Sequence, residues 1–162
     1  MVSSSDATLC EAIETMFPLL TEFAIMVWND VFIPITYKYD ISIIINDVLA
    51  LVTSIADQEA GTTVIEWPSN TFRARWALTW AANEVTIKSS WESVIGGTES
   101  LLNAASDLII EKDAFLAEWG SLLRVLSDVI HRFTEGVKVE FDLSALDATI
   151  HRIPSRGHLY AN

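Results

Sequence analysis

Two runs of alternating side chains, at residues 72–80 and 85–91, restrict the fold of this chain more than any other feature. Their apolar set is Phe72, Ala74, Trp76, Leu78 and Trp80, followed after the residues 81–84 by Val85, Ile87, Ser89 and Trp91. A period of two places alternate side chains on opposite faces of a strand. The runs therefore predict an antiparallel hairpin with one buried and one solvated face, joined by a turn at 81–84.

A longer alternation covers residues 31–45, with apolar or aromatic residues at the odd positions and Lys38 and Asp40 on the other side. By its period this is a strand, and Pro34 belongs near its beginning or at an edge, because proline has no amide hydrogen to donate. Asn46 and Asp47 predict a turn after it. The apolar segment 48–61 that follows fits a short helix or a second strand.

Helical spacing predicts two main helices. The first covers about 7–20, with Thr8 and Glu11 at the spacing of a capping box and Pro18 near its end. The second covers 113–133, where Asp113 can cap the start and Gly136, just beyond, can end the helix, and its apolar stripe is wide enough to cover a sheet.

Shorter patterns complete the prediction. They are strands at 62–68 and 137–141, a short strand or the approach to a helix at 107–111, a short helix at 101–107, and a short helix or extended segment at 143–150. Together the patterns predict an α+β fold, an antiparallel Trp-rich β-sheet with helices packed mainly on one face. The length of 162 residues suits a single domain over 1–162, with a C-terminal tail over 151–162.

The charge is strongly acidic and uneven. Of 22 acidic and 10 basic residues, ten acids and only one base, Lys38, lie within residues 1–70. This distribution excludes nucleic acid and anionic membrane surfaces as partners, because both require clustered Lys and Arg. It is explained either by solubility alone or by binding to a basic protein.

The chain offers little else for location or chemistry. Its apolar runs are interrupted by Glu22 and Asp47 and fall short of the ~20 residues that span a membrane. The beginning of the sequence has no basic segment typical of a secretory signal. The single cysteine, Cys10, suits a reducing compartment and fits a small core residue better than a nucleophile, so we expect a cytoplasmic protein.

No arrangement of residues predicts catalysis. The spacing of His131, His151 and His158 matches no metal-ligand pattern, and neither a nucleophile elbow nor a P-loop is present. We therefore expect no enzyme activity, no cofactor and no metal. Trp76, Trp80 and Trp91 belong to the core, whereas Trp28 or Trp67, if exposed, would suit an anchor for a partner.

A small α+β chain with one cysteine, many acids and no catalytic motif resembles bacterial immunity proteins, which neutralise a cognate toxin domain in polymorphic-toxin and contact-dependent-inhibition systems. The resemblance is one of overall character. It implies stoichiometric binding of a basic toxin by the acidic 30–66 region. The residues expected to bind are Asp30, Asp40, Asp47, Asp57, Glu59, Glu66 and Trp67. The alternative is a homo-oligomeric structural or small-ligand-binding module, with the 33–45 strand as its pairing edge.

Overall fold

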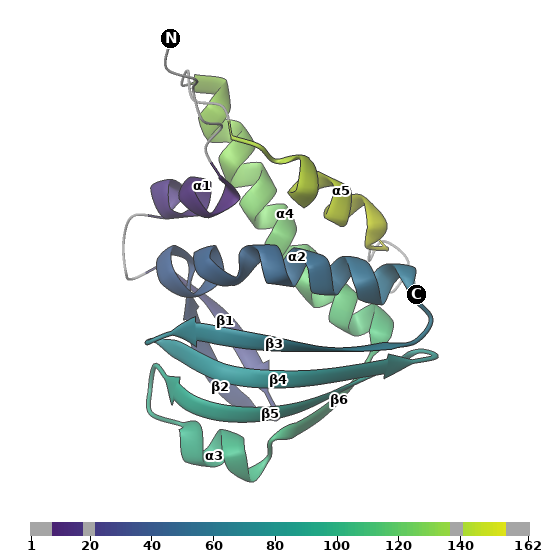
Figure 1. Cartoon of the computed structure of the whole chain (residues 1–162). Helices are drawn as coiled ribbons and strands as arrows, with labels where there is room; N and C mark the ends of the chain where they lie inside the picture. The colour runs from purple at the N-terminus through teal and green to yellow at the C-terminus, as the bar shows by residue number, and fades with distance from the viewer. Residues whose placement is uncertain (1–7, 18–21, 137–140, 155–162) are drawn as a thin grey trace, which may run out of the picture.

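The computed structural model describes residues 8–17, 22–136 and 141–154, and it confirms the α+β fold (Figure 1). Along the chain the elements are α1 (Leu9–Met16), β1 (Phe23–Trp28), β2 (Val31–Thr36), the π-helix η1 (Tyr37–Ile41), α2 (Ser42–Asp57), β3 (Gly61–Ser69), β4 (Phe72–Ala81), β5 (Glu84–Val94), α3 (Glu99–Ala104), β6 (Asp107–Glu111), α4 (Lys112–Gly136) and α5 (Ser144–Arg152). The strands form a four-stranded sheet and a separate two-stranded hairpin.

The larger sheet is antiparallel with the order β3-β4-β5-β6. The predicted hairpin forms its centre as β4 and β5, with Trp80 opposite Val85. Ala82 takes a φ of 51° in the tight turn between the strands. The apolar residues of the set are buried, Ser89 is half-buried, and the residues between are mostly exposed, which confirms one covered and one solvated face. The strand predicted at 62–68 is β3, and the segment 107–111, left open between a strand and a helix approach, is the strand β6.

Helices cover the buried face of this sheet. Figure 1 shows α2 lying above β3, with α4 passing behind it and α5 alongside. α4 is the predicted main helix, lengthened to Lys112–Gly136, so that Asp113 lies in its first turn and does not cap it. α1 has the predicted capping box, in which Thr8 Oγ1 accepts from Glu11 N at 3.2 Å and Glu11 Oε2 accepts from Thr8 N at 2.7 Å. The segment 143–150, left open between helix and extended chain, lies in α5 with the residue before it.

Three predictions fall partly outside the described residues. The first is the helix expected over about 7–20 with Pro18 near its end: α1 ends at Met16, and Pro18 lies outside the described residues. The strand expected at 137–141 leaves only Phe141 within the described part. Of the expected tail over 151–162, residues 151 and 152 end α5, and residues 155–162 are not described.

The predicted strand over 31–45 is correct only as far as Thr36, where β2 ends and the chain turns into η1 and α2. Thr36 and Asp40 cap this turn reciprocally, because Thr36 Oγ1 accepts from Asp40 N at 3.1 Å and Asp40 Oδ2 accepts from Thr36 N at 2.7 Å. Asn46 and Asp47 lie within α2, so the turn expected there is wrong. The alternation misled because Ile41 and Ile45 also share one face of a helix, while Ile43 between them is 47% exposed.

The helical stretch Tyr37–Asp57 is, within the described part, long and apolar enough to cross a membrane by length and composition. Fifty-six per cent of its apolar window is buried inside the protein. Burial of more than half of an apolar helix is typical of a helix in the core of a protein.

The second sheet is the hairpin of β1 and β2. Its two turn residues, Asn29 and Asp30, have φ values of 45° and 67°, as in the type I′ turns that match the twist of paired strands. Asn29 Nδ2 donates to the carbonyl oxygens of Ala105 at 2.7 Å and Asp107 at 2.9 Å. These bonds fasten the tip of the hairpin to the beginning of β6.

Candidate binding cleft

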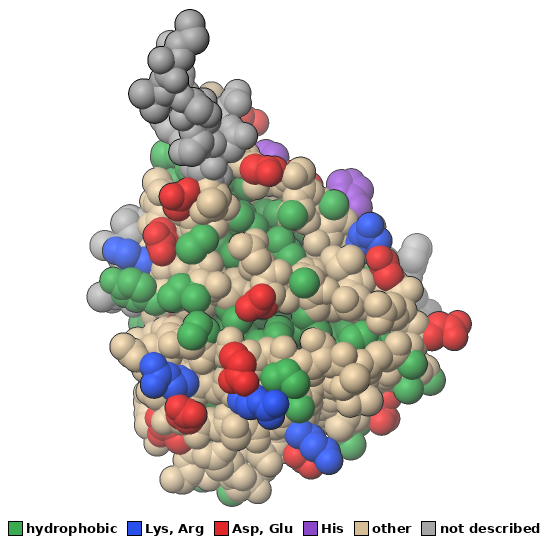
Figure 2. Space-filling model, viewed as in Figure 1, with side chains coloured by type: hydrophobic (Ala, Val, Ile, Leu, Met, Phe, Trp, Pro, Cys, Tyr) green, Lys and Arg blue, Asp and Glu red, His purple; other side chains and the backbone are tan. Residues whose placement is uncertain are grey.

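The acids expected to bind a partner do not form one surface. Asp57 forms an ion pair with Arg152, and Glu66 forms one with Arg75 at 2.9 Å. The other exposed acids expected to bind lie in three places, Asp30 in the hairpin turn, Asp47 on α2 and Glu59 in the loop before β3. On the face seen in Figure 2, acidic side chains are scattered singly or in small groups and are not gathered into a patch.

Asp40 cannot contact a partner, because its side chain belongs to the interior. The residue is 1% exposed. Besides the bond from Thr36 N, its carboxylate accepts a short hydrogen bond from Thr71 Oγ1. The prediction that Asp40 is a binding residue is therefore wrong, because a buried polar group that is fully hydrogen-bonded supports the fold.

Trp67 is not an exposed anchor either. It is 2% exposed and packs against Phe72, Trp76 and Trp119, with ring centroids 4.6, 5.0 and 6.3 Å away. Trp28 is also 2% exposed and lies 5.1 Å from each of the rings of Trp76 and Trp91. These aromatic residues join the hairpin, the sheet and α4 into one core, and Trp76, Trp80 and Trp91 are buried as predicted.

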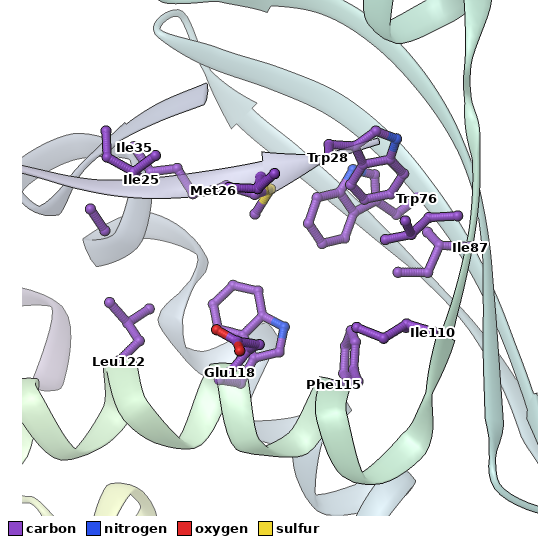
Figure 3. Close-up of a pocket in the computed structure, with 14 residues that line it drawn as sticks. Ile25, Met26, Trp28, Ile35, Trp76, Ile87, Ile110, Phe115, Glu118 and Leu122 are labelled. Carbon is purple, nitrogen blue, oxygen red and sulfur yellow. The ribbon is translucent and has the colours of Figure 1, made fainter. Parts of the chain in front are cut away.

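An apolar cleft of about 360 Å³ lies beside this core. β1 forms one wall with residues 24–28, and α4 forms the opposite wall (Figure 3). The α4 wall consists of Phe115, Glu118, Trp119 and Leu122, and the remaining lining consists of Ile35, Trp76, Ile87, Leu108 and Ile110. Glu118 extends from α4 toward the hairpin, and among the described residues that line the cleft it is the only charged one.

The outer face of the hairpin is also apolar, and it is exposed. Phe23, Ile25 and Val27 of β1 are 42%, 57% and 54% exposed, and Phe32 of β2 is 69% exposed. In the register of the hairpin Val27 is opposite Phe32, and Ile25 is opposite Pro34. Contiguous exposed apolar surface of this kind marks interaction sites in soluble proteins.

The charges near the cleft are acidic. Within the segments 22–36 and 115–122 the charged residues are Glu22, Asp30 and Glu118, with no Lys or Arg before Tyr37 and none from Phe115 to Leu122. Lys112, at the beginning of α4, instead donates to the carbonyl oxygen of Gln58 at 2.9 Å. Among the described residues that line the cleft, an incoming basic side chain would therefore meet no like charge.

This surface was not predicted, because residues 21–30 are apolar without a clear period and because the alternation that follows predicts a strand as far as residue 45. A signal was present: from Phe23 to Ile35 both faces of two short strands are apolar, and Asp30 is the only charged residue. A hairpin needs one apolar face to pack on a core, so a second apolar face indicates a surface that the core does not cover.

Among the described residues, which do not include His158, the other candidate groups for chemistry are not brought together into a site. His131 Nε2 lies 3.1 Å from Asp147 Oδ2, and His151 Nδ1 lies 2.7 Å from the carbonyl oxygen of Asp147. Among the described residues no group of three or more His, Cys, Asp or Glu side chains is placed to hold a metal. Burial and the neighbouring Glu14 raise the pKa of the Cys10 thiol above its ordinary value of 9.0, which disfavours the nucleophilic thiolate.

Comparison with known proteins adds no relative. The chain matches no protein-family model, no curated protein and no solved structure.

Proposed function

We propose that this protein binds a basic protein stoichiometrically and neutralises it, as bacterial immunity proteins do with their toxins. The observation that supports the proposal is the exposed apolar face of the β1–β2 hairpin beside the cleft. Large apolar side chains on a water-exposed face become an energetic gain when a partner covers them, at about 25 cal/mol for each Å² removed from water.

The sequence predicted that the acids contact the partner, whereas in this proposal they attract it from a distance. With a net charge of −12, the protein attracts a basic partner over a distance and raises the rate of encounter. The affinity would come from the apolar hairpin. A toxin that acts on nucleic acid must present Lys and Arg to phosphates, and these are the groups that an acidic inhibitor would cover. A cytoplasmic location is part of the proposal.

The test uses the product of the reading frame adjacent to the gene as the binding probe, measured by titration calorimetry. We expect 1:1 binding, and we expect Ile25→Asp to weaken it at least about 30-fold, which is the loss at an interface hot spot of 2 kcal/mol. Because Ile25 is exposed, the substitution should leave the fold intact.

A matched control is Ile109→Asp, because Ile109 is 64% exposed on β6, on the solvated face of the larger sheet. We expect the control to bind like the wild type. Equal affinity of Ile25→Asp and Ile109→Asp would refute the hairpin as the binding surface. Absence of binding in the wild type would refute the adjacent product as the partner.

The same apolar face favours a second candidate, a homo-oligomer in which two hairpins cover each other. The cleft volume also falls at the lower end of the range of small-ligand pockets. Light scattering at micromolar concentration tests the homo-oligomer: a dimer that Ile25→Asp converts to a monomer would support self-association. We favour a separate basic partner because self-association brings two strongly acidic chains together.

A further inference from the structure

The two edges of the β1–β2 hairpin differ in their capacity to pair with another strand. Across a two-residue turn the flanking residues Trp28 and Val31 form a hydrogen-bonded pair, and the pattern then alternates along the hairpin. Tyr37 N donates to Glu22 O at 3.3 Å, which continues the alternation to its other end. The even-numbered residues of β1 therefore bond to β2, and the backbone groups of Phe23, Ile25 and Val27 point away from it.

The edge of β2 is closed to a further strand. Its outward-facing backbone positions are Phe32, Pro34 and Thr36, by the same alternation. Pro34 has no amide hydrogen, and the amide of Thr36 already donates to Asp40 Oδ2. Proline and occupied amides are the usual means by which proteins prevent pairing at an edge. The pairing edge expected from the 33–45 alternation is thus blocked.

The edge of β1 is open. In the described part of the chain β1 pairs with β2 alone, and no backbone hydrogen bond joins Phe23, Ile25 or Val27 to another element. This edge runs along the cleft, since consecutive β1 residues 24–28 line it and α4 lies opposite (Figure 3). A strand added at the normal spacing of about 4.8 Å would enter the cleft and lie over α4.

We propose that an extended segment of the partner adds to the open edge of β1 as a third strand, with alternate apolar side chains in the cleft and with Lys or Arg among the residues between them, which the net charge of −12 attracts. Backbone pairing at an exposed edge, with pockets that select alternate side chains, is an established mode of peptide recognition. The inference rests on the proposed function in naming a basic protein as the source of the segment.

Charge decides between this occupant and a second copy of the chain. If two β1 strands paired edge to edge, the carboxylates of Glu118 and Asp30 in one copy would approach an equally acidic copy. Like charges across an interface oppose binding, whereas Lys or Arg in a foreign strand would be attracted. The same edge is therefore suited to a basic strand.

The first experiment uses a blocked synthetic peptide, acetyl-Thr-Val-Lys-Val-Lys-Val-Thr-amide, and hydrogen exchange measured by NMR. At millimolar peptide we expect the amides of Ile25 and Val27 to exchange at least about tenfold more slowly, because they gain acceptors. The amides of Met26 and Trp28 already bond to β2 and serve as internal controls.

Two matched peptides separate the parts of the proposal. Replacing both Lys by Glu, or N-methylating alternate residues so that no edge-facing donor remains, should abolish the protection. Equal protection by the Glu peptide would overturn the preference for a basic strand. Unchanged exchange at Ile25 and Val27 with the Lys peptide, or equal binding of the N-methylated peptide, would overturn strand addition.

A second experiment separates failure of strand addition from failure of the proposed function. Ile25 lies at a position that does not bond to β2, so Ile25→Pro removes the outward amide and should leave the hairpin bonds in place, while Ile25→Ala removes only the side chain. Against the adjacent gene product we expect Ile25→Pro to bind about tenfold more weakly than Ile25→Ala. Val27→Pro and Val27→Ala provide a second pair if Ile25→Pro fails to fold, as judged by near-UV circular dichroism.

If the proline and alanine variants bind equally, and both more weakly than the wild type, strand addition is overturned and the binding surface stands. If neither differs from the wild type, the hairpin is not the binding surface and both proposals fail.

Discussion

Asp40 offers the most direct test of how charge is used in this protein, because the sequence suggested a binding acid and the structure buries it. Replacing it by alanine removes the acceptor for Thr36 N and for Thr71 Oγ1. The first bond joins the end of β2 to η1, and the second joins η1 to the β3–β4 connection. We expect Asp40→Ala to destabilise the fold and to act on binding only through that loss.

The magnitude follows from these two bonds. A hydrogen bond to a charged group contributes about 1.5–3 kcal/mol, so the pair amounts to about 3–6 kcal/mol. Part is recovered because alanine no longer requires a carboxylate to be buried. We therefore expect Asp40→Ala to lower the free energy of unfolding by about 3 kcal/mol, which corresponds to a fall in Tm of about 6–12 °C for a chain of this size.

The assay is urea unfolding followed by Trp fluorescence, with Asp47→Ala as the control. Asp47 is an exposed acid on α2, and its replacement should change the free energy of unfolding by no more than about 0.5 kcal/mol. Asp40→Asn, which keeps the volume and one oxygen acceptor, should lie between the two. A loss below about 1 kcal/mol for Asp40→Ala, or an equal loss for Asp47→Ala, would refute this account of the β2–η1 junction.

Two further predictions concern the remaining acids and the thiol. The triple change Asp30→Asn, Asp47→Asn and Glu59→Gln should slow association with the basic partner in stopped-flow measurements and reduce the dependence of the association rate on salt. The dissociation rate should change little, because these exposed acids act at a distance. An unchanged association rate at low salt would contradict electrostatic steering. Cys10 should react with iodoacetamide at pH 8 more slowly than a free thiol, because burial and Glu14 raise its pKa above 9.0, and the difference should vanish in urea. Equal rates for folded and unfolded protein would show that the thiol is not perturbed.

The elements predicted correctly are those whose signal is local and unambiguous. In β4 and β5 the alternation has a solvated face of charged and hydroxyl side chains, which a helix would not produce. The stripe of α4 repeats over many turns, and the capping box of α1 lies within four residues. Each of these signals depends on neighbours in the chain, so the sequence is enough to read them.

The prediction for residues 37–45 was wrong because its local signal fits two periods. Ile41 and Ile45 suit one face of a helix as well as one face of a strand. The decision is made by Asp40, whose carboxylate bonds to Thr71, 31 positions away, in the interior. The prediction that Asp40 and Trp67 bind a partner was wrong for a related reason, since a count of charges or aromatic rings does not say which side chains the fold buries.

The sequence by itself determined the α+β class, the buried aromatic face of the sheet, the main helix and the acidic charge of this protein, because residue type and spacing within a few positions are sufficient for these properties. Only the tertiary structure decided that β1, within the described part of the chain, pairs with β2 alone and keeps its other edge beside an apolar cleft, with a carboxylate from α4 opposite. An unpaired edge and a cleft are defined by which segments fail to meet. That depends on how β1, β6 and α4, far apart in the chain, are placed by the packing of Trp28 against Trp76 and Trp91 and by the bonds of Asn29.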